Sequence, residues 1–443
     1  MKQKNTLGYV IFMAVVAAIG GILFGYDTAV ISGTTAIVKN QFALTDMMEG
    51  WYVGCALIGS ICGVLAAGTL SDYLGRKLTM LISAALFSIS AIGCAVCGSF
   101  DALVAFRIIG GVGIGIVSIV SPIYISEVSP AKIRGTLVSL YQLAVTVGFL
   151  LAYLANWVID VNGDMAVAGD LWTNIWNCEM WRGMLGSETL PALLFFFIIF
   201  FIPESPKWLI VNGKLDKASL VLSKIYSTEE EVKEEINVTN ASLKGENKGK
   251  WSDLLKPGIL LAVITGSAIA ILGQFMGVNA VLYYGPKIFA DAGFDNPMFS
   301  TVLVGVVNMV TTILAVFIID KVGRKQLIYW GVSGMIICLL AIGIYFAWGS
   351  QIGLGNGFML TFFLAYVFCC AISISAIVFV LLSEMYPNSV RGRAMSIAGF
   401  ALWIGTYLIG QLTPVLLGWS QAGTFFIFAV MCVPYMLIMW KVV

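Results

Sequence analysis

The sequence predicts an all-α membrane protein with twelve transmembrane helices, arranged as two pseudo-symmetric six-helix bundles with an intracellular helical linker domain. Composition is the first observation behind this fold class. Hydrophobic residues make up 59% of the 443 residues and charged residues only 11%, and the mean hydropathy is +0.94, far outside the range of a soluble domain. Charged loop motifs that occur once in each half, and a polar segment between the halves, are the other two.

Twelve apolar stretches are long enough to cross a ~30 Å hydrocarbon core, which needs roughly 20 helical residues. The first stretch follows Lys2 and Lys4 and has the look of a signal peptide, but it continues for some 25 residues and contains Asp27. We therefore expect it to be a retained helix. The expected spans are 8–33, 49–70, 79–98, 102–124, 137–158, 183–203, 258–291, 298–319, 327–348, 358–383, 395–417 and 422–441.

Two charged loop motifs recur about 250 residues apart, between corresponding spans of the two halves. Repeated halves with the same loops are typical of transporters that rock one half against the other. We interpret the acids and arginines as salt bridges of an inner gate, which close when the cavity faces outward and separate when it opens inward. The alternative is that they only fix loops at the membrane surface. The residues concerned are Asp72, Arg76, Glu127 and Arg134 in the first half, and Asp320, Arg324, Glu384 and Arg391 in the second. Glu127 and Arg134, like Glu384 and Arg391, lie seven residues apart across a proline-marked helix break, and we expect each acid to pair with that arginine.

The distribution of basic residues predicts the orientation. Most of the 25 lysines and arginines lie in segments that share one side of the membrane with both termini, and the excess of positive charge marks that side as cytoplasmic. The expected domains are a bundle over 1–203, an intracellular helical domain over 204–256 and a second bundle over 257–443. The linker is rich in lysine and glutamate, which favours short amphipathic helices over the alternative of a solvated linker.

Three ionisable residues lie inside spans, where such residues are costly and usually functional. Counted from the ends of their spans at ~1.5 Å per residue, Asp27, Arg107 and Glu188 fall in one layer of the first half. The arginine favours charged carboxylates, whereas burial favours protonated ones. A carboxylate in that balance can take up and release a proton, as a proton-coupled transporter requires. The alternative is a static buried ion pair.

The seventh span contains glycines and a proline that weaken the helix, together with polar side chains. Interrupted helices near the midplane usually line substrate cavities. Amides supply donors and acceptors together, and aromatic faces suit the C–H surfaces of a polyhydroxylated solute. Each polar residue alone could instead join helices, but their number indicates a neutral polar substrate. The residues are Gln274, Asn279 and Tyr283 in the seventh span, with Gln142 and Asn308 in the fifth and eighth.

Catalytic and metal chemistry have little basis in this sequence. The chain has no histidine, and its nine cysteines fall almost entirely inside predicted spans. Cys94 and Cys97 form a C-x-x-C pattern within an apolar helix, which we interpret as packing. We therefore expect no enzyme activity, no metal and no cofactor.

Several motifs make the chain similar to the sugar porter family of the major facilitator superfamily over nearly its whole length. They are the G-x-x-x-D-x-x-G-R-K loop at 68–77, the two Arg-Gly loops at 134–135 and 391–392, Pro203-Glu204-Ser205-Pro206-Lys207-Trp208-Leu209, and the Q-x-x-G-x-N phrase with two tyrosines at 274–284. The resemblance implies two six-helix bundles, an intracellular helical domain and one monosaccharide at their interface. It also adds Glu204 to the inner-gate residues.

The resemblance assigns roles residue by residue. Asp27 matches the acidic position of proton-coupled members, and Arg107 and Glu188 match its neighbours. The chain departs from the family pattern at Gly273, where a second glutamine is usual, and at Phe379, where a tryptophan stands in xylose carriers. The implied sugar-lining positions are Phe24, Gln142, Gln274, Asn279, Tyr283, Asn308, Phe379 and Trp403.

These inferences together predict a proton-coupled symporter that imports a monosaccharide by alternating access. A pentose or hexose is expected, with a xylose-like sugar favoured. The expected partners are the sugar, the proton and membrane lipid, with no nucleic acid, for a monomer in the cytoplasmic membrane of a bacterium. One alternative is a uniporter in which Asp27 stays paired with Arg107, and the other is a sugar sensor that binds without transporting.

Overall fold

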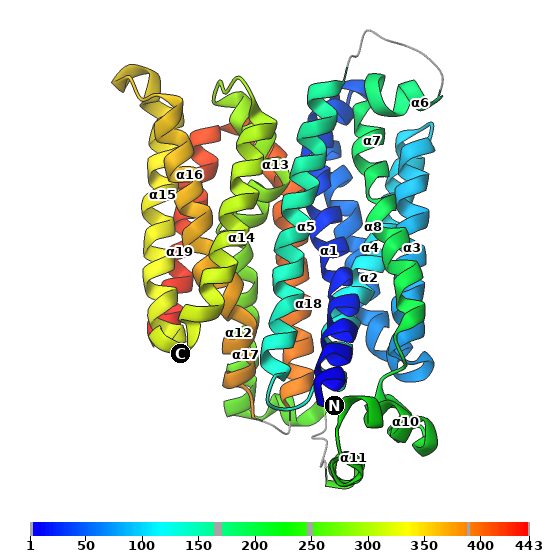
Figure 1. Ribbon diagram of the computed structural model, residues 1–443. Coiled ribbons are helices and arrows are strands. Elements are labelled where there is room, and N and C mark those ends of the chain that lie inside the picture. The colour runs from blue at the N-terminus through cyan, green and yellow to red at the C-terminus, as the bar shows by residue number, and fades with distance from the viewer. Residues whose placement is uncertain (1–2, 164–170, 246–250, 388–389, 442–443) are drawn as a thin grey trace. The chain divides into compact units, whose positions relative to one another are not determined.

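The computed structural model describes residues 3–163, 171–245, 251–387 and 390–441, and every regular element in this part of the chain is helical (Figure 1). Twelve helical segments are long and apolar enough to span a membrane. The predicted fold class is therefore confirmed. The segments are Thr6–Gln41, Asp46–Leu74, Arg76–Val96, Phe100–Val128, Arg134–Asn162, Met180–Phe201, Pro257–Asp291, Pro297–Ile319, Arg324–Ile352, Asn356–Phe379, Arg391–Trp419 and Gln421–Lys441.

The first five spans are single helices, and the sixth is broken. Ser99 caps the fourth helix, since its side chain accepts a hydrogen bond from the amide of Ala102. The sixth span is interrupted at Glu188, which occupies a turn between two helices. The elements are α1 (Gln3–Gln41), α2 (Asp46–Leu74), α3 (Arg76–Val96), α4 (Phe100–Val128), α5 (Arg134–Asn162), α6 (Leu171–Thr173), the π-helix η1 (Asn174–Cys178), α7 (Met180–Ser187), α8 (Thr189–Ile198) and the 3₁₀-helix η2 (Ile199–Phe201).

Short helices follow the sixth span. Ser205 caps the first of them and Pro206 occupies its first turn, a position where the missing N–H of proline costs nothing. The second is amphipathic, with Ala218, Val221 and Leu222 buried on one face. These elements are α9 (Pro206–Val211), α10 (Leu215–Ile225), α11 (Glu229–Gly245) and the 3₁₀-helix η3 (Trp251–Leu255).

The last six spans include two irregular ones. The seventh divides at Gly277, whose φ of 90° is a left-handed conformation that glycine adopts readily. The tenth contains a π-helix, which the sequence analysis did not predict. The elements are α12 (Pro257–Phe275), α13 (Val278–Asp291), α14 (Pro297–Val322), α15 (Arg324–Ile352), α16 (Asn356–Cys370), the π-helix η4 (Ala371–Ser375), α17 (Ala376–Met385), α18 (Arg391–Trp419) and α19 (Gln421–Lys441).

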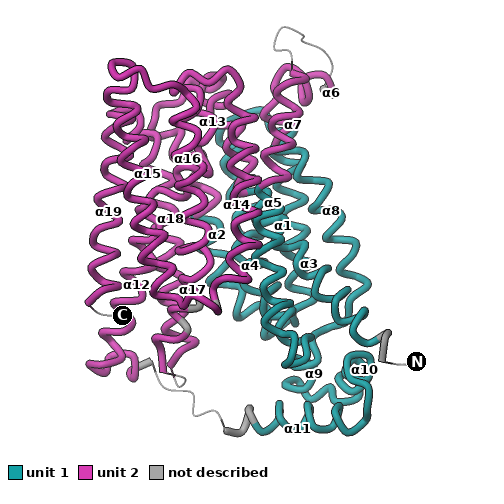
Figure 2. Tube along the Cα trace, turned by 60° about the vertical axis from the view of Figure 1, so that its left-hand side comes forward, with its two compact units in different colours: residues 1–27, 58–149, 185–247 teal, residues 28–57, 150–184, 248–443 magenta. Residues whose placement is uncertain are grey.

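The chain forms two compact units, drawn in separate colours in Figure 2. Unit 1 comprises residues 1–27, 58–149 and 185–247, and within it α3 packs along α4 and against α8. Unit 2 comprises residues 28–57, 150–184 and 248–443, where α15 packs on α19 and α12 on α18. The division into domains at 203 and 256 stays a prediction.

The first two spans extend further than their apolar stretches. α1 continues to Gln41 and α2 begins at Asp46, although 8–33 and 49–70 were expected. The additional turns carry Lys39 on α1, which forms ion pairs with both Asp46 and Glu49 on α2. Opposite charges between neighbouring helices thus extend both helices past the apolar core.

Candidate functional site

Asp27 and Arg107 form a buried ion pair within unit 1. The Arg107 Nη1 donates to Asp27 Oδ1 across 2.6 Å, and the two side chains are 3% and 2% exposed. They lie on α1 and α4, 80 positions apart in the sequence. Charges so thoroughly removed from water are retained only when they are paired, so each of these two groups depends on the other for its charge.

Glu188 is the third predicted member of this layer, and the structure brings it to the same place. Its side chain is 2% exposed, and its carboxyl group interacts with both Asp27 and Arg107. One carboxyl oxygen, Oε1, makes no hydrogen bond to a described residue. Two carboxyl groups therefore share one guanidinium in a buried site.

A hydroxyl pair that the sequence analysis missed lies next to the three charges. Tyr26 Oη and Ser187 Oγ are 2.6 Å apart, and Tyr26 is buried. Two consecutive residues of α1, Tyr26 and Asp27, thus contact two consecutive residues of the sixth span, Ser187 and Glu188. The sequence could have indicated this pair, because Tyr26 and Ser187 lie directly beside the predicted acids Asp27 and Glu188.

The break in the seventh span organises a polar cluster in unit 2. Asn279 Nδ2 donates to Gln274 Oε1 across 2.6 Å, from the other side of Gly277. Thr406 Oγ1 on α18 approaches the same oxygen at 3.2 Å. The sequence analysis predicted the two amides but missed Thr406, although it lies three positions after the predicted Trp403. These contacts hold the Gln274 amide in a defined orientation.

The other residues predicted to line a sugar site are distributed over both units. In unit 1, Phe24 lies on α1 and Gln142 on α5. In unit 2, Tyr283 is buried on α13, whereas Phe379 on α17 is 53% exposed. Asn308 lies on α14 and Trp403 on α18. Their contact with a sugar stays a prediction.

Gly273 lies beside this cluster, where the family usually has a glutamine. A Cβ placed there would meet Ile374 at 3.5 Å and Tyr435 at 3.8 Å, which are ordinary contact distances. The first carbon of a side chain at position 273 would thus fit without a clash. The absence of one removes an amide from the neighbourhood of Gln274, which leaves fewer hydrogen-bonding groups in the predicted sugar site.

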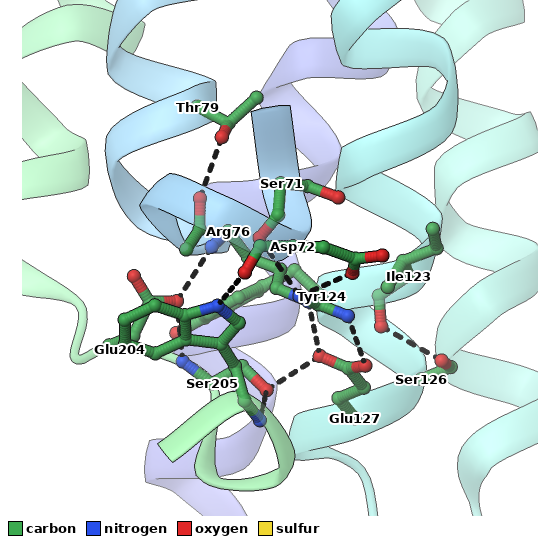
Figure 3. A network of polar contacts seen from close by, with 12 residues as sticks. Ser71, Asp72, Arg76, Thr79, Ile123, Tyr124, Ser126, Glu127, Glu204 and Ser205 are labelled. Carbon is green, nitrogen blue, oxygen red and sulfur yellow. Dashed lines mark hydrogen bonds and ion pairs between the residues drawn. The ribbon is translucent and has the colours of Figure 1, made fainter. Parts of the chain in front are cut away.

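Three of the predicted inner-gate residues of the first half, Asp72, Arg76 and Glu127, form one connected network (Figure 3). Arg76 binds Glu127 through two parallel hydrogen bonds, from Nε to Oε2 at 2.9 Å and from Nη2 to Oε1 at 3.1 Å. The same guanidinium donates to Asp72 at 3.2 Å, and Ser205 Oγ donates to Glu127 at 2.6 Å. Bidentate pairs of this kind are among the stronger polar contacts in proteins.

Glu204 connects this network to the segment after the sixth span. Its Oε1 accepts hydrogen bonds from the backbone amides of Arg76 and Lys77 at 2.9 and 3.1 Å. Gly75 allows this approach, since its φ is 94° and a Cβ there would collide with the Glu204 carboxylate. Burial raises the pKa of Glu204 above its ordinary value, although the amide donors oppose that shift.

The salt-bridge partners in the structure differ from those that the sequence spacing predicts. Glu127 was expected to pair with Arg134, but it pairs with Arg76, while Arg134 donates to the carbonyl of Ser129 at 3.4 Å. The second half repeats this pattern. Arg324 pairs with Glu384 at 3.5 Å, and Arg391 donates to the carbonyl of Tyr386 at 3.4 Å. The side chain of Asp320 lies outside the described part of the chain.

Comparison with known proteins gives consistent matches. The family model described as "Sugar (and other) transporter" matches residues 13–443. The arabinose-proton symporter of Bacillus subtilis is 39% identical over 97% of this chain and 91% of its own length. The glucose transport protein of a Synechocystis strain is 36% identical over 94% and 90%. The inward-open conformation of the xylose transporter XylE from E. coli superposes with a TM-score of 0.84, at 34% identity, covering 98% of this chain and 96% of that one.

Proposed function

The chain belongs to the sugar porter family of the major facilitator superfamily, and from this premise we propose that it imports a monosaccharide together with a proton. Membership of this family makes the chain a sugar transporter and not an enzyme. The proton coupling, the direction of transport and the identity of the sugar belong to the proposal.

The observation that carries the proposal is the buried group of two carboxyl groups and one guanidinium. Asp27 and Glu188 both interact with Arg107 in a site almost closed to water. When the site opens to the outside, water and protons reach it, and protonation of Asp27 weakens its attraction to Arg107. The proton then leaves when the site opens to the inside. Relatives that are proton symporters of arabinose and xylose support this coupling.

The substrate class follows from the polar cluster on the seventh span. Gln274, Asn279 and Thr406 present amide and hydroxyl groups without net charge. Such groups match the hydroxyl groups of a neutral sugar better than an ionic solute. The named relatives carry arabinose, glucose and xylose, so we propose a pentose or hexose, with a xylose-like pentose favoured.

The transport cycle requires gates that open in turn. The Arg76–Glu127 and Arg324–Glu384 pairs occupy corresponding places in the two repeats. We propose that they hold the inner side closed in the outward-facing state and separate as the halves rock. The excess of lysines and arginines around these motifs supports our proposal that this side and both chain termini face the cytoplasm, in the inner membrane of a bacterium.

A uniporter is the second candidate, and the close Arg107–Asp27 contact favours it. In that candidate Asp27 stays paired with Arg107, which it contacts at 2.6 Å, and an acid that never exchanges this partner for a proton cannot couple transport. Sugar uptake into proteoliposomes under an imposed inward proton gradient separates the two candidates. The symporter concentrates sugar above the external level, whereas the uniporter only equilibrates it.

A further inference from the structure

Glu49 is a buried carboxylate in unit 2 that forms ion pairs with two lysines. Its side chain is 0% exposed, and Oε2 lies 2.7 Å from Lys39 Nζ and 2.9 Å from Lys287 Nζ. Lys287 also donates to Oε1 at 2.9 Å. All three residues belong to unit 2, within which their contacts are described. Such a carboxylate remains charged only with partners beside it.

The two lysines come from different repeats of the chain. Lys39 lies on α1 and Glu49 on α2, ten positions apart in the first repeat. Lys287 lies on α13, in the seventh span and 238 positions from Glu49. If the repeats rock against each other, Lys39 and Glu49 travel together and Lys287 moves away from both. The Lys39–Glu49 pair thus stays intact through the cycle, whereas the Glu49–Lys287 pair breaks.

A second set of contacts joins α2 and α13 to α18 near the ion cluster. Gln411 Nε2 on α18 donates to the carbonyl oxygen of Met47 at 2.9 Å, and Tyr284 Oη donates to the carbonyl oxygen of Gly410 at 2.7 Å. Gly50 permits this packing, because a Cβ there would collide with the backbone carbonyl of Gln411. The N-terminal end of α2 therefore packs directly against α18 and close to α13.

We propose that Glu49 and Lys287 form an electrostatic latch that closes the outer side of the transporter, and that Lys39 remains the cationic partner of Glu49 when the latch opens. The proposal rests on the proposed alternating-access cycle, in which this end of the helices faces outward. In the closed state Glu49 has two cationic partners. In the open state it retains Lys39 and gains water, while Lys287 has Asp291, with which it also interacts, one turn further along α13.

The latch predicts opposite effects for the two lysines. Lys287→Met removes a contact made only in the closed state, so the outer side should open more often. Lys39→Met removes the partner that Glu49 keeps in both states. Opening would then leave Glu49 with no cation, so the outer side should open less often. A merely structural ion cluster would instead respond to both substitutions in the same direction.

Hydrogen–deuterium exchange of the full-length protein in nanodiscs tests this proposal without sugar or a proton gradient. The readout is amide exchange in segments 46–54 and 282–291. We expect Lys287→Met to raise the open population on the order of ten-fold and Lys39→Met to lower it. Lys287→Arg, which keeps the charge, should resemble the wild type. Gly50→Val, which forces α2 from α18, supplies the exchange level of an opened outer side.

Two outcomes overturn the latch: equal exchange in the wild type and Lys287→Met, or a change of the same sign in both methionine variants. Should Lys287→Met fail to fold, Glu49→Gln answers the same question, since it also weakens the closed state and should raise exchange. Because this readout involves neither proton nor sugar, it can fail while proton coupling through Asp27 stands. The converse also holds.

Discussion

The Arg107 guanidinium and the Asp27 carboxylate meet at 2.6 Å in a part of unit 1 that is almost sealed from solvent. Helices α1 and α4 supply one charge each, and the sixth span adds Glu188 where its helix is interrupted. An ion pair that costs so much to desolvate is stable only while it is intact. This makes it sensitive to any change in protonation, which is the property that our account of the transport cycle uses.

The hydroxyl pair next to these charges should help to hold Glu188 in register with Asp27. Tyr26→Phe removes a buried neutral hydrogen bond, which is worth about 0.5–1.5 kcal/mol. We expect a lower melting temperature and a shifted pH profile of sugar-driven proton uptake. Ser187→Ala should produce the same shift and add nothing in the double variant, whereas Ser187→Thr should behave as wild type. Independent, additive effects would contradict the pairing at 2.6 Å.

The polar cluster on the seventh span should determine affinity for the sugar. Gln274→Ala and Asn279→Ala each remove an amide, so we expect uptake to weaken strongly, mainly through a higher KM. Thr406→Val should act in the same direction but more weakly, while Thr406→Ser retains the hydroxyl and should be close to wild type. Initial rates over a range of sugar concentrations provide the measurement. Near-normal transport by both alanine variants would show that this cluster is not the sugar site.

The Arg76–Glu127 pair should stabilise the folded protein far more than the neighbouring Asp72 contact. Glu127→Gln breaks a bidentate pair whose side chains are mostly buried, at a cost of roughly 3 kcal/mol. Asp72 is mostly exposed, so Asp72→Asn should cost less than about 1 kcal/mol. Thermal unfolding in detergent compares the two. Equal losses in both variants would mean that Arg76 does not depend on Glu127.

Glu204 should give the stability of the protein a defined pH dependence. Burial raises the folded-state pKa of Glu204 above its ordinary value of 4.5, so the folded protein binds this proton more tightly than the unfolded chain. The resulting stabilisation is complete below pH 4.5 and is lost as pH rises through the raised folded-state pKa. Glu204→Gln keeps an acceptor and cannot titrate. Its melting temperature should fall less than that of the wild type between pH 4.5 and 8, and identical slopes would contradict the assignment.

Composition and span lengths were enough to predict the twelve-helix fold, because a bilayer leaves few alternatives to long apolar helices. Counting residues from the span ends also placed Asp27, Arg107 and Glu188 in one layer, and the structure brings them together although the sixth span is interrupted at Glu188. The inner network was harder. Spacing favoured Glu127 with Arg134, yet Arg76 reaches Glu127 because the start of α3 lies beside the end of α4. Such tertiary neighbours are not encoded in local spacing.

The same limit explains the contacts that the sequence analysis missed. Thr406 acquires its role only because α18 packs along α12, and Ser187 only because Tyr26 lies opposite it. The prediction of a weakened seventh helix rested on its glycines and its proline, but the helix divides at Gly277 alone, while Gly285 and Pro286 lie within α13. A residue in the left-handed conformation ends a helix. A proline within a membrane helix removes one hydrogen bond, which neighbouring groups can replace, so the helix continues.

Proton movement on addition of sugar tests the central claim most directly. Proteoliposomes containing the wild-type protein, without any imposed gradient, receive a pentose or hexose while the external pH is recorded. Coupling through Asp27 predicts that the medium becomes alkaline as sugar and protons enter together. Asp27→Asn should abolish this signal while sugar exchange across the membrane continues. Sugar entry without alkalinisation in the wild type, or an unchanged signal in Asp27→Asn, would contradict the account.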